Sequence, residues 1–235
     1  MLSENLEKVR KTVENACHVS GRDPGEVLVL AVSKMKPAED IQALYDVGQR
    51  DFGENYVQEM QKKHEALPQD IRWHMIGHLQ KNKVKYIAPY VTMIHSVDSG
   101  DLAAMIEKEA AKCGRTIDVL IEVNVAGEDT KYGTDPAGAA ELAAYIRTLP
   151  HVKLRGLMTS APYVADPEEN RPVFRELRQL MIDLNRENDN NDSMDILSMG
   201  MSNDFAVAVE EGSACVRVGT LIFGERDYGN KQQSV

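Results

Sequence analysis

The chain has 235 residues, of which 43% are hydrophobic, and a formal net charge of −10 at neutral pH. This length suits one domain with a full core, and the acidic balance argues against the broad basic surface that nucleic-acid binding requires. Its three cysteines are far apart, its first residues are charged and it contains no long apolar run. These features argue against a disulfide framework, a secretory signal and a membrane span, and they predict a cytoplasmic protein.

Apolar runs with strand character alternate with segments of helical periodicity along the chain. In chain order we expect a leading helix over 3–18, strand and helix pairs at 27–32 and 38–47, 51–53 and 56–67, 71–76 and 81–87, 91–96 and 100–112, 118–125 and 136–149, 153–158 and 167–186, 194–199 and 203–211, and a last strand at 215–218.

This alternation predicts an α/β fold, a single (β/α)8 TIM barrel with an extra N-terminal helix. The leading helix would occupy the outer position left open by a missing helix after the last strand. An open, doubly wound sheet is the competing fold. No linker divides the chain, so we expect one domain over residues 1–229 and a flexible tail over 230–235.

Lys34 follows the first predicted strand, at the edge of the sheet where a barrel places its functional groups. A lysine amine becomes a nucleophile for an aldehyde when burial or a nearby cation favours its neutral form, and Lys36 is a candidate for that cation. Lys34 is therefore a candidate Schiff-base lysine. The alternative is a lysine that extends from a strand end to solvent.

Two loops late in the chain have the composition of an anion site. Residues 198–203 place two serines and a glycine just before a predicted helix, where backbone N–H groups and hydroxyls can hold a phosphate. Gly219 and Thr220 follow the last strand, which lies beside the first strand, and so beside Lys34, if the barrel closes. The simpler alternative is a helix cap and an ordinary tight turn.

Arg217 lies two residues before Gly219 and therefore on the same side of the last strand. An arginine beside a pyridine ring would keep the ring nitrogen unprotonated. Pairing with a carboxylate at the barrel mouth is the alternative. His74 and His78 have a spacing that suits metal ligands on a helix, but His74 falls in a predicted strand and no third ligand is evident, so no metal is expected.

Six motifs, in order and over nearly the whole chain, resemble those of the pyridoxal phosphate homeostasis protein family. They are Leu30-Ala31-Val32-Ser33-Lys34-x-Lys36-Pro37, Phe52-Gly53-Glu54-Asn55-Tyr56-Val57-Gln58-Glu59, Trp73-His74-x-Ile76-Gly77-x-Leu79-Gln80-x-Asn82-Lys83, Leu154-Arg155-Gly156-Leu157-Met158, Leu197-Ser198-Met199-Gly200-Met201-Ser202 and Arg217-Val218-Gly219-Thr220-x-x-Phe223-Gly224. Met35 departs from the family pattern, which commonly has a small polar residue there.

The resemblance implies a fold-type III pyridoxal phosphate protein, similar to the N-terminal domain of alanine racemase, with pyridoxal 5′-phosphate as cofactor. By motif, the resemblance assigns cofactor contacts to Lys34 as the Schiff-base lysine, to Ser198, Ser202, Gly219 and Thr220 at the phosphate, to Arg217 at the pyridine nitrogen, and to Asn55, His78 and Met199 along the pocket wall.

The function that the resemblance implies is intracellular pyridoxal phosphate (vitamin B6) homeostasis, without an established catalytic turnover. Racemisation needs acid and base groups on both faces of the cofactor, and racemases of this fold take one of them from an extra β domain that is not evident in this sequence. A single-domain amino-acid racemase is the alternative, and a protein-interaction regulator is a third. Expected partners are the cofactor, small amino acids and pyridoxal-phosphate-dependent apo-enzymes. A monomer is expected, and a role of Lys36 as a second cofactor acceptor is left open.

Overall fold

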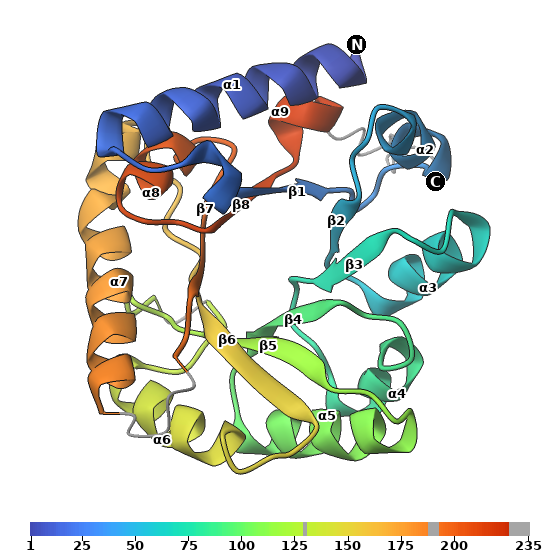
Figure 1. The fold of residues 1–235 in the computed structure, drawn as a ribbon, viewed down its shortest axis with the longest axis vertical. Coiled ribbons are helices and arrows are strands. Elements are labelled where there is room, and N and C mark those ends of the chain that lie inside the picture. Colours follow the sequence, from blue (N-terminus) through green and yellow to red (C-terminus); the bar gives the residue numbers. More distant parts are fainter. Residues whose placement is uncertain (129–130, 188–192, 226–235) are drawn as a thin grey trace, which may run out of the picture.

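The computed structural model describes residues 1–128, 131–187 and 193–225. Eight parallel strands close into a barrel in sequence order, with β8 paired to β1 (Figure 1). The strands are β1 (Leu28–Val32), β2 (Asp51–Glu54), β3 (Arg72–Met75), β4 (Met93–Val97), β5 (Ile117–Glu122), β6 (Val152–Met158), β7 (Ile196–Met201) and β8 (Cys215–Val218). The predicted (β/α)8 barrel is confirmed, and closure of the sheet rules out the doubly wound alternative.

Helices surround this barrel on the outside (Figure 1). The α-helices are α1 (Leu2–Ser20), α2 (Ala38–Asp46), α3 (Val57–Ala66), α4 (Val84–Ile87), α5 (Gly100–Lys112), α6 (Pro136–Ile146), α7 (Arg171–Arg186), α8 (Phe205–Glu210) and α9 (Thr220–Phe223), and the 3-10 turns are η1 (Pro24–Glu26), η2 (Lys81–Lys83) and η3 (Pro167–Asn170). The leading helix α1 packs against α8 and α9 through a buried stripe that includes Leu6, Val9 and Val13. It therefore occupies the expected position in the outer ring.

Three details differ from the sequence-based expectations. A one-turn helix, α9, follows the last strand, where no helix was expected. Strand β5 ends at Glu122 instead of reaching Val125, because Val123 pairs with Thr134 in an isolated bridge outside the barrel ladder. The helices expected to begin at residues 81 and 167 both open with a 3-10 turn. The predicted flexible tail, 230–235, lies outside the described residues.

Most of the apolar core lies between the strands and the surrounding helices. Trp73 and Phe52 are fully buried there, with ring centroids 6.1 Å apart. A second, smaller apolar cluster of Met93, Leu120 and Met158 is separate from this layer. It lies on the inward face of the strands, since successive side chains of a strand point to opposite faces. Buried polar side chains also lie inside the barrel, which is unusual for a core and indicates a functional interior; they include Asp51, His74, His95, Glu122, Ser198 and Arg217.

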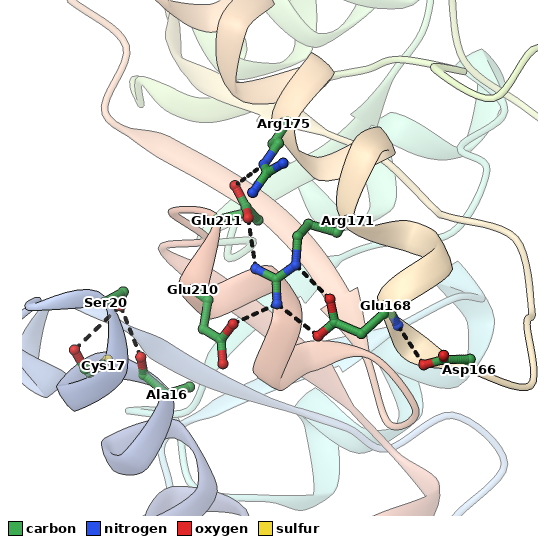
Figure 2. Close-up of polar contacts among 9 residues, drawn as sticks. All are labelled: Ala16, Cys17, Ser20, Asp166, Glu168, Arg171, Arg175, Glu210 and Glu211. Atoms are coloured by element: carbon green, nitrogen blue, oxygen red, sulfur yellow. Dashed lines mark hydrogen bonds and ion pairs between the residues drawn. The ribbon is translucent and has the colours of Figure 1, made fainter.

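A cluster of charged side chains ties the end of α8 to the start of α7 (Figure 2). The Arg171 guanidinium donates hydrogen bonds to Glu168 (2.7 Å), Glu210 (2.6 Å) and Glu211 (2.7 Å), and Arg175 donates to Glu211 (3.0 Å). Three carboxylates around one guanidinium satisfy most of its donors in a fixed geometry. The cluster therefore anchors α8, the helix that follows the carboxyl end of β7.

Candidate functional site

A cavity of about 520 Å³ lies at the carboxyl ends of β1, β7 and β8. Its walls include six of the residues that the sequence motifs assigned to a cofactor site, Lys34, Asn55, Ser202, Arg217, Gly219 and Thr220. The exposed side chains of Tyr163 and Leu221 form part of its rim. Barrel closure places β8 beside β1, and this brings together residues that are almost 190 positions apart in sequence. The volume is typical of a small-molecule site.

The segment that carries Lys34 leaves β1 in a strained turn. Met35 has a φ of 62°, the left-handed region that a side chain other than glycine rarely adopts. Its N–H donates to Glu59 Oε1 at 2.6 Å, which holds this conformation. Lys36 Nζ donates to the backbone carbonyls of Phe223 (3.1 Å) and Glu225 (3.0 Å). The turn is therefore fixed at both ends, and such strain is commonly stored at functional sites.

A buried ion pair lies directly beneath this turn. Ser33 Oγ donates to Glu54 Oε1 at 2.6 Å, and Lys63 Nζ donates to the same oxygen and to the Ser33 carbonyl, both at 2.7 Å. Lys63 also bonds Glu59, which joins the pair to Met35. Burial raises the pKa of the Glu54 carboxyl to about 7, against the opposing effect of Lys63. Lys63 was not among the predicted site residues, although its place on the buried stripe of α3 was a usable signal.

The loop between β7 and α8 is held in place at the opposite wall of the cavity. Asp204 accepts hydrogen bonds from the Met201 N–H and from Asn170 Nδ2, each at 2.7 Å. Gly200 has a φ of 92°, and a Cβ there would lie 2.6 Å from the Ala208 Cβ, so only glycine fits. These constraints place the loop so that Ser202 lines the cavity.

Arg217 is buried below the cavity and is held by three oxygen acceptors. Its Nη1 donates to the Ser198 carbonyl (2.7 Å) and to Ser198 Oγ (2.8 Å), and its Nη2 donates to the Thr159 carbonyl (2.8 Å). These are neutral groups, so the carboxylate partner considered in the sequence analysis is not among its hydrogen-bond acceptors. Within the described part of the chain no carboxylate bonds the Arg217 guanidinium, and Arg217 lines the cavity.

The structure puts three of the proposed site residues elsewhere. Ser198 is fully buried behind Arg217 and does not line the cavity. Met199, next to it on β7, points to the opposite face of the strand and packs in the main apolar core. His78 lies at the mouth, where its ring stacks on Tyr132 with centroids 4.1 Å apart, and it lines two neighbouring grooves instead of this cavity.

Glu122, at the end of β5, was also missed, because the strand was expected to continue to residue 125. Burial raises the pKa of the Glu122 carboxyl to about 7, while Arg217 opposes this shift and Asp98 adds to it. The side chain is 8% exposed. The interior next to Arg217 therefore contains a carboxyl group that changes charge near neutral pH.

This carboxyl predicts how stability depends on pH. Because the folded state raises the pKa from about 4.5 to about 7, it binds more protons than the unfolded state, and stability should fall as pH rises through that window. We expect Glu122→Gln to be more stable than the parent at pH 8, by at most about 3 kcal/mol, and equal to it at pH 5. Urea unfolding at both pH values measures this. The exposed Glu141→Gln is the control, and equal effects of the two substitutions would contradict the assignment.

Among the described residues, no three His, Cys, Asp or Glu side chains are grouped as metal ligands. His74 bonds other partners in the barrel interior, and His78 lies beside Tyr132. No helix in the described part of the chain combines the length and the apolar character needed to cross a membrane.

The fold and this site together define a barrel of the alanine racemase N-terminal-domain class. The profile of that family, described as alanine racemase, N-terminal domain, matches residues 3–227. An alanine racemase structure from Clostridium difficile has a TM-score of 0.74 at 15% identity, covers 99% of this chain and 58% of its own length, and supports the fold alone.

Closer relatives specify the family. A pyridoxal phosphate homeostasis protein of Aquifex aeolicus is 50% identical over 226 residues, which cover 96% of this chain and 98% of the relative. The structure of PipY from Synechococcus elongatus with pyridoxal phosphate (PLP) bound has a TM-score of 0.82 at 34% identity. The match covers 95% of this chain and 100% of PipY. The chain belongs to the pyridoxal phosphate homeostasis protein family, as its six motifs predicted.

Proposed function

We propose that this protein binds pyridoxal 5′-phosphate (PLP) in the cavity at the barrel mouth, holds it as a Schiff base on Lys34, and acts in intracellular PLP homeostasis. One observation carries the proposal. Lys34, from near the start of the chain, lines a single cavity of about 520 Å³ together with Arg217 and two phosphate-type loops from near its end. The names of the family relatives and the PLP bound in PipY support the same ligand.

The groups around the cavity fit the three chemical parts of PLP. Ser202, Gly219 and Thr220 offer backbone N–H groups and hydroxyls to the phosphate. Lys34 supplies the amine that condenses with the aldehyde, releasing water. Asn55 lines the same cavity beside them.

Arg217 favours binding and storage over catalysis. Bound PLP supplies an electron sink to an amino-acid substrate, and this sink is strong when the ring nitrogen is protonated. A guanidinium has no proton to give at neutral pH, so Arg217 would leave the ring nitrogen unprotonated. The monomeric state, the cytoplasmic location, the exchange with small amino acids and the apo-enzyme partners stay predictions.

Borohydride reduction followed by peptide mass spectrometry tests the attachment. We expect PLP-loaded protein to carry the reduced cofactor on the peptide that contains Lys34, because this amine lines the cavity. Lys34→Ala should abolish the visible absorbance that develops when PLP is titrated into the protein.

Lys36→Ala is the matched control, since the side chain of Lys36 is directed to backbone carbonyls near the end of α9. It should retain the absorbance and the reduced adduct on Lys34. An adduct on another lysine with Lys34 unmodified would reject the assignment.

A further inference from the structure

A continuous row of hydrogen bonds crosses the barrel interior and ends at Arg217. Asp51 Oδ1 contacts His74 Nε2 (3.2 Å), His74 Nδ1 contacts His95 Nε2 (2.9 Å), His95 Nδ1 contacts Ser198 Oγ (2.9 Å), and Arg217 Nη1 donates to Ser198 Oγ (2.8 Å). We call these five residues the interior chain. They come from five strands, β2, β3, β4, β7 and β8, and each side chain is almost completely buried.

The acidic end determines the direction of every bond in the interior chain. Burial opposes ionisation of Asp51, but hydrogen bonds from His74 and Arg72 outweigh it and lower the pKa of the carboxyl. An ionised Asp51 requires a proton on His74 Nε2. When His74 is neutral, its Nδ1 must accept a proton from His95 Nε2–H. His95 Nδ1 then accepts from the Ser198 hydroxyl, and the Ser198 oxygen accepts from Arg217.

One added proton reverses the two bonds of His95. If His74 becomes an imidazolium, both of its nitrogens donate, one to Asp51 and one to His95 Nε2. Burial lowers the pKa of His95 well below its ordinary value, with His74 and Arg217 adding to the effect, so His95 stays neutral. It must then carry its proton on Nδ1 and donate to Ser198 Oγ. The row gains one proton in total, and His95 changes tautomer without changing charge.

The reversal changes how many hydrogen bonds the Ser198 oxygen, an acceptor of Arg217, receives. In the first arrangement the Ser198 oxygen accepts from Arg217 alone, while in the second it accepts from both Arg217 and His95. The displaced Ser198 hydroxyl proton can turn toward Cys215, which is paired with Ser198 between β7 and β8, and burial raises the pKa of that thiol to about 12, so it stays neutral. The guanidinium that lines the PLP cavity therefore shares its acceptor in one state and not in the other.

We propose that the interior chain is a two-state device in which His95 and Ser198 are positioning residues that transmit the protonation of His74 to Arg217. A second cavity of about 500 Å³, at the opposite end of the barrel, is lined by both histidines and gives His74 a route for proton exchange. Charged groups surround His74 and His95 on three sides. Asp51 and Arg72 lie at His74, and Arg217 and Glu122 lie toward the mouth of the barrel. Around the second cavity the charged residues are Arg22, Glu26 and Asp195.

Histidine-selective ¹⁵N NMR on the full chain tests the two states directly. At about pH 8.5 we expect both His74 and His95 to be protonated on Nε2 alone. As pH is lowered to about 5.5, the His95 proton should move from Nε2 to Nδ1 in whichever transition adds a proton to His74. A His95 tautomer that stays the same over this whole range would overturn the proposal.

The coupling to the cavity has its own test, which rests on the proposed PLP function, whereas the NMR test does not. Between the two pH extremes, the ratio of the Kd values of Ser198→Ala and the parent for PLP should change about fivefold or more, as expected for linked sites. Because the variant and the parent bind the same ligand at each pH, the ratio of their Kd values does not contain the effect of PLP's own titration. His18→Gln, an exposed change on α1, should give a constant ratio to the parent. A constant ratio for Ser198→Ala would refute transmission to Arg217 even if His95 changes tautomer, and loss of PLP binding by the parent would refute the proposed function alone.

Discussion

Replacing Lys63 by methionine should destabilise the folded protein by about 3–5 kcal/mol at pH 8. Lys63 is 6% exposed, and its ammonium group is the only cation bonded to the fully buried Glu54 among the described residues. Without Lys63, Glu54 must remain as an uncompensated buried anion or take up a proton. The loss of folding stability should therefore be smaller at about pH 5.5, where protonation of Glu54 costs less free energy. Urea unfolding of the parent and the variant at both pH values measures the effect.

Lys62→Met is the matched control, because the neighbouring Lys62 side chain is exposed and should change stability by less than about 0.5 kcal/mol. A second substitution, Glu54→Gln, should recover part of the loss in the Lys63→Met background by removing the buried charge. Equal destabilisation by Lys62→Met and Lys63→Met, or a loss that does not depend on pH, would show that the ion pair does not act in this way.

Gly156→Ala should be the most damaging small substitution in the barrel, with a loss of at least about 3 kcal/mol. A Cβ at Gly156 would lie 1.8 Å from the Ile196 carbonyl oxygen, and Gly156 and Ile196 are directly paired between β6 and β7. Backbone atoms cannot move away without separating the two strands, so the ladder between β6 and β7 must break. The thermal unfolding midpoint and the yield of folded protein measure the loss.

Gly100→Ala is the corresponding control at the start of α5. Its new Cβ would meet only the Tyr145 ring at 3.5 Å, an ordinary contact, and alanine favours a helix more than glycine does. This variant should be neutral or slightly stabilised. A folded Gly156→Ala protein with an unchanged unfolding midpoint would mean that β6 and β7 can move apart at little cost.

Both predictions concern residues that support the cavity without lining it. Lys63 holds the turn after β1 through the Ser33 carbonyl and through Glu59, which accepts from the Met35 N–H. Gly156 allows β6 to lie close to β7, the strand that leads to Ser202. The groups that face the ligand are therefore placed by buried contacts behind them, a common feature of precise binding sites.

Much of the site could be predicted from sequence because its members end strands. Lys34, Arg217, Gly219 and Thr220 follow or close clear apolar runs, and a barrel gathers such positions at one mouth. The positions that differed depended on local detail. Met199 points away from the cavity because Ser198 points inward, and adjacent residues of a strand alternate. Glu122 was missed because a single bridge at Val123 ends β5 early.

By itself, the sequence determined the alternation of strands and helices, the motifs that identify the family and the lysine proposed to bind PLP, because periodicity and short motifs are local properties of a chain. Only the tertiary structure decided which polar residues meet inside the barrel. His74, His95, Ser198 and Arg217 occupy four separate strands, and nothing local in the sequence links one to another. Barrel closure and register bring their side chains into one hydrogen-bonded row, and such long-range contacts depend on packing of the whole fold.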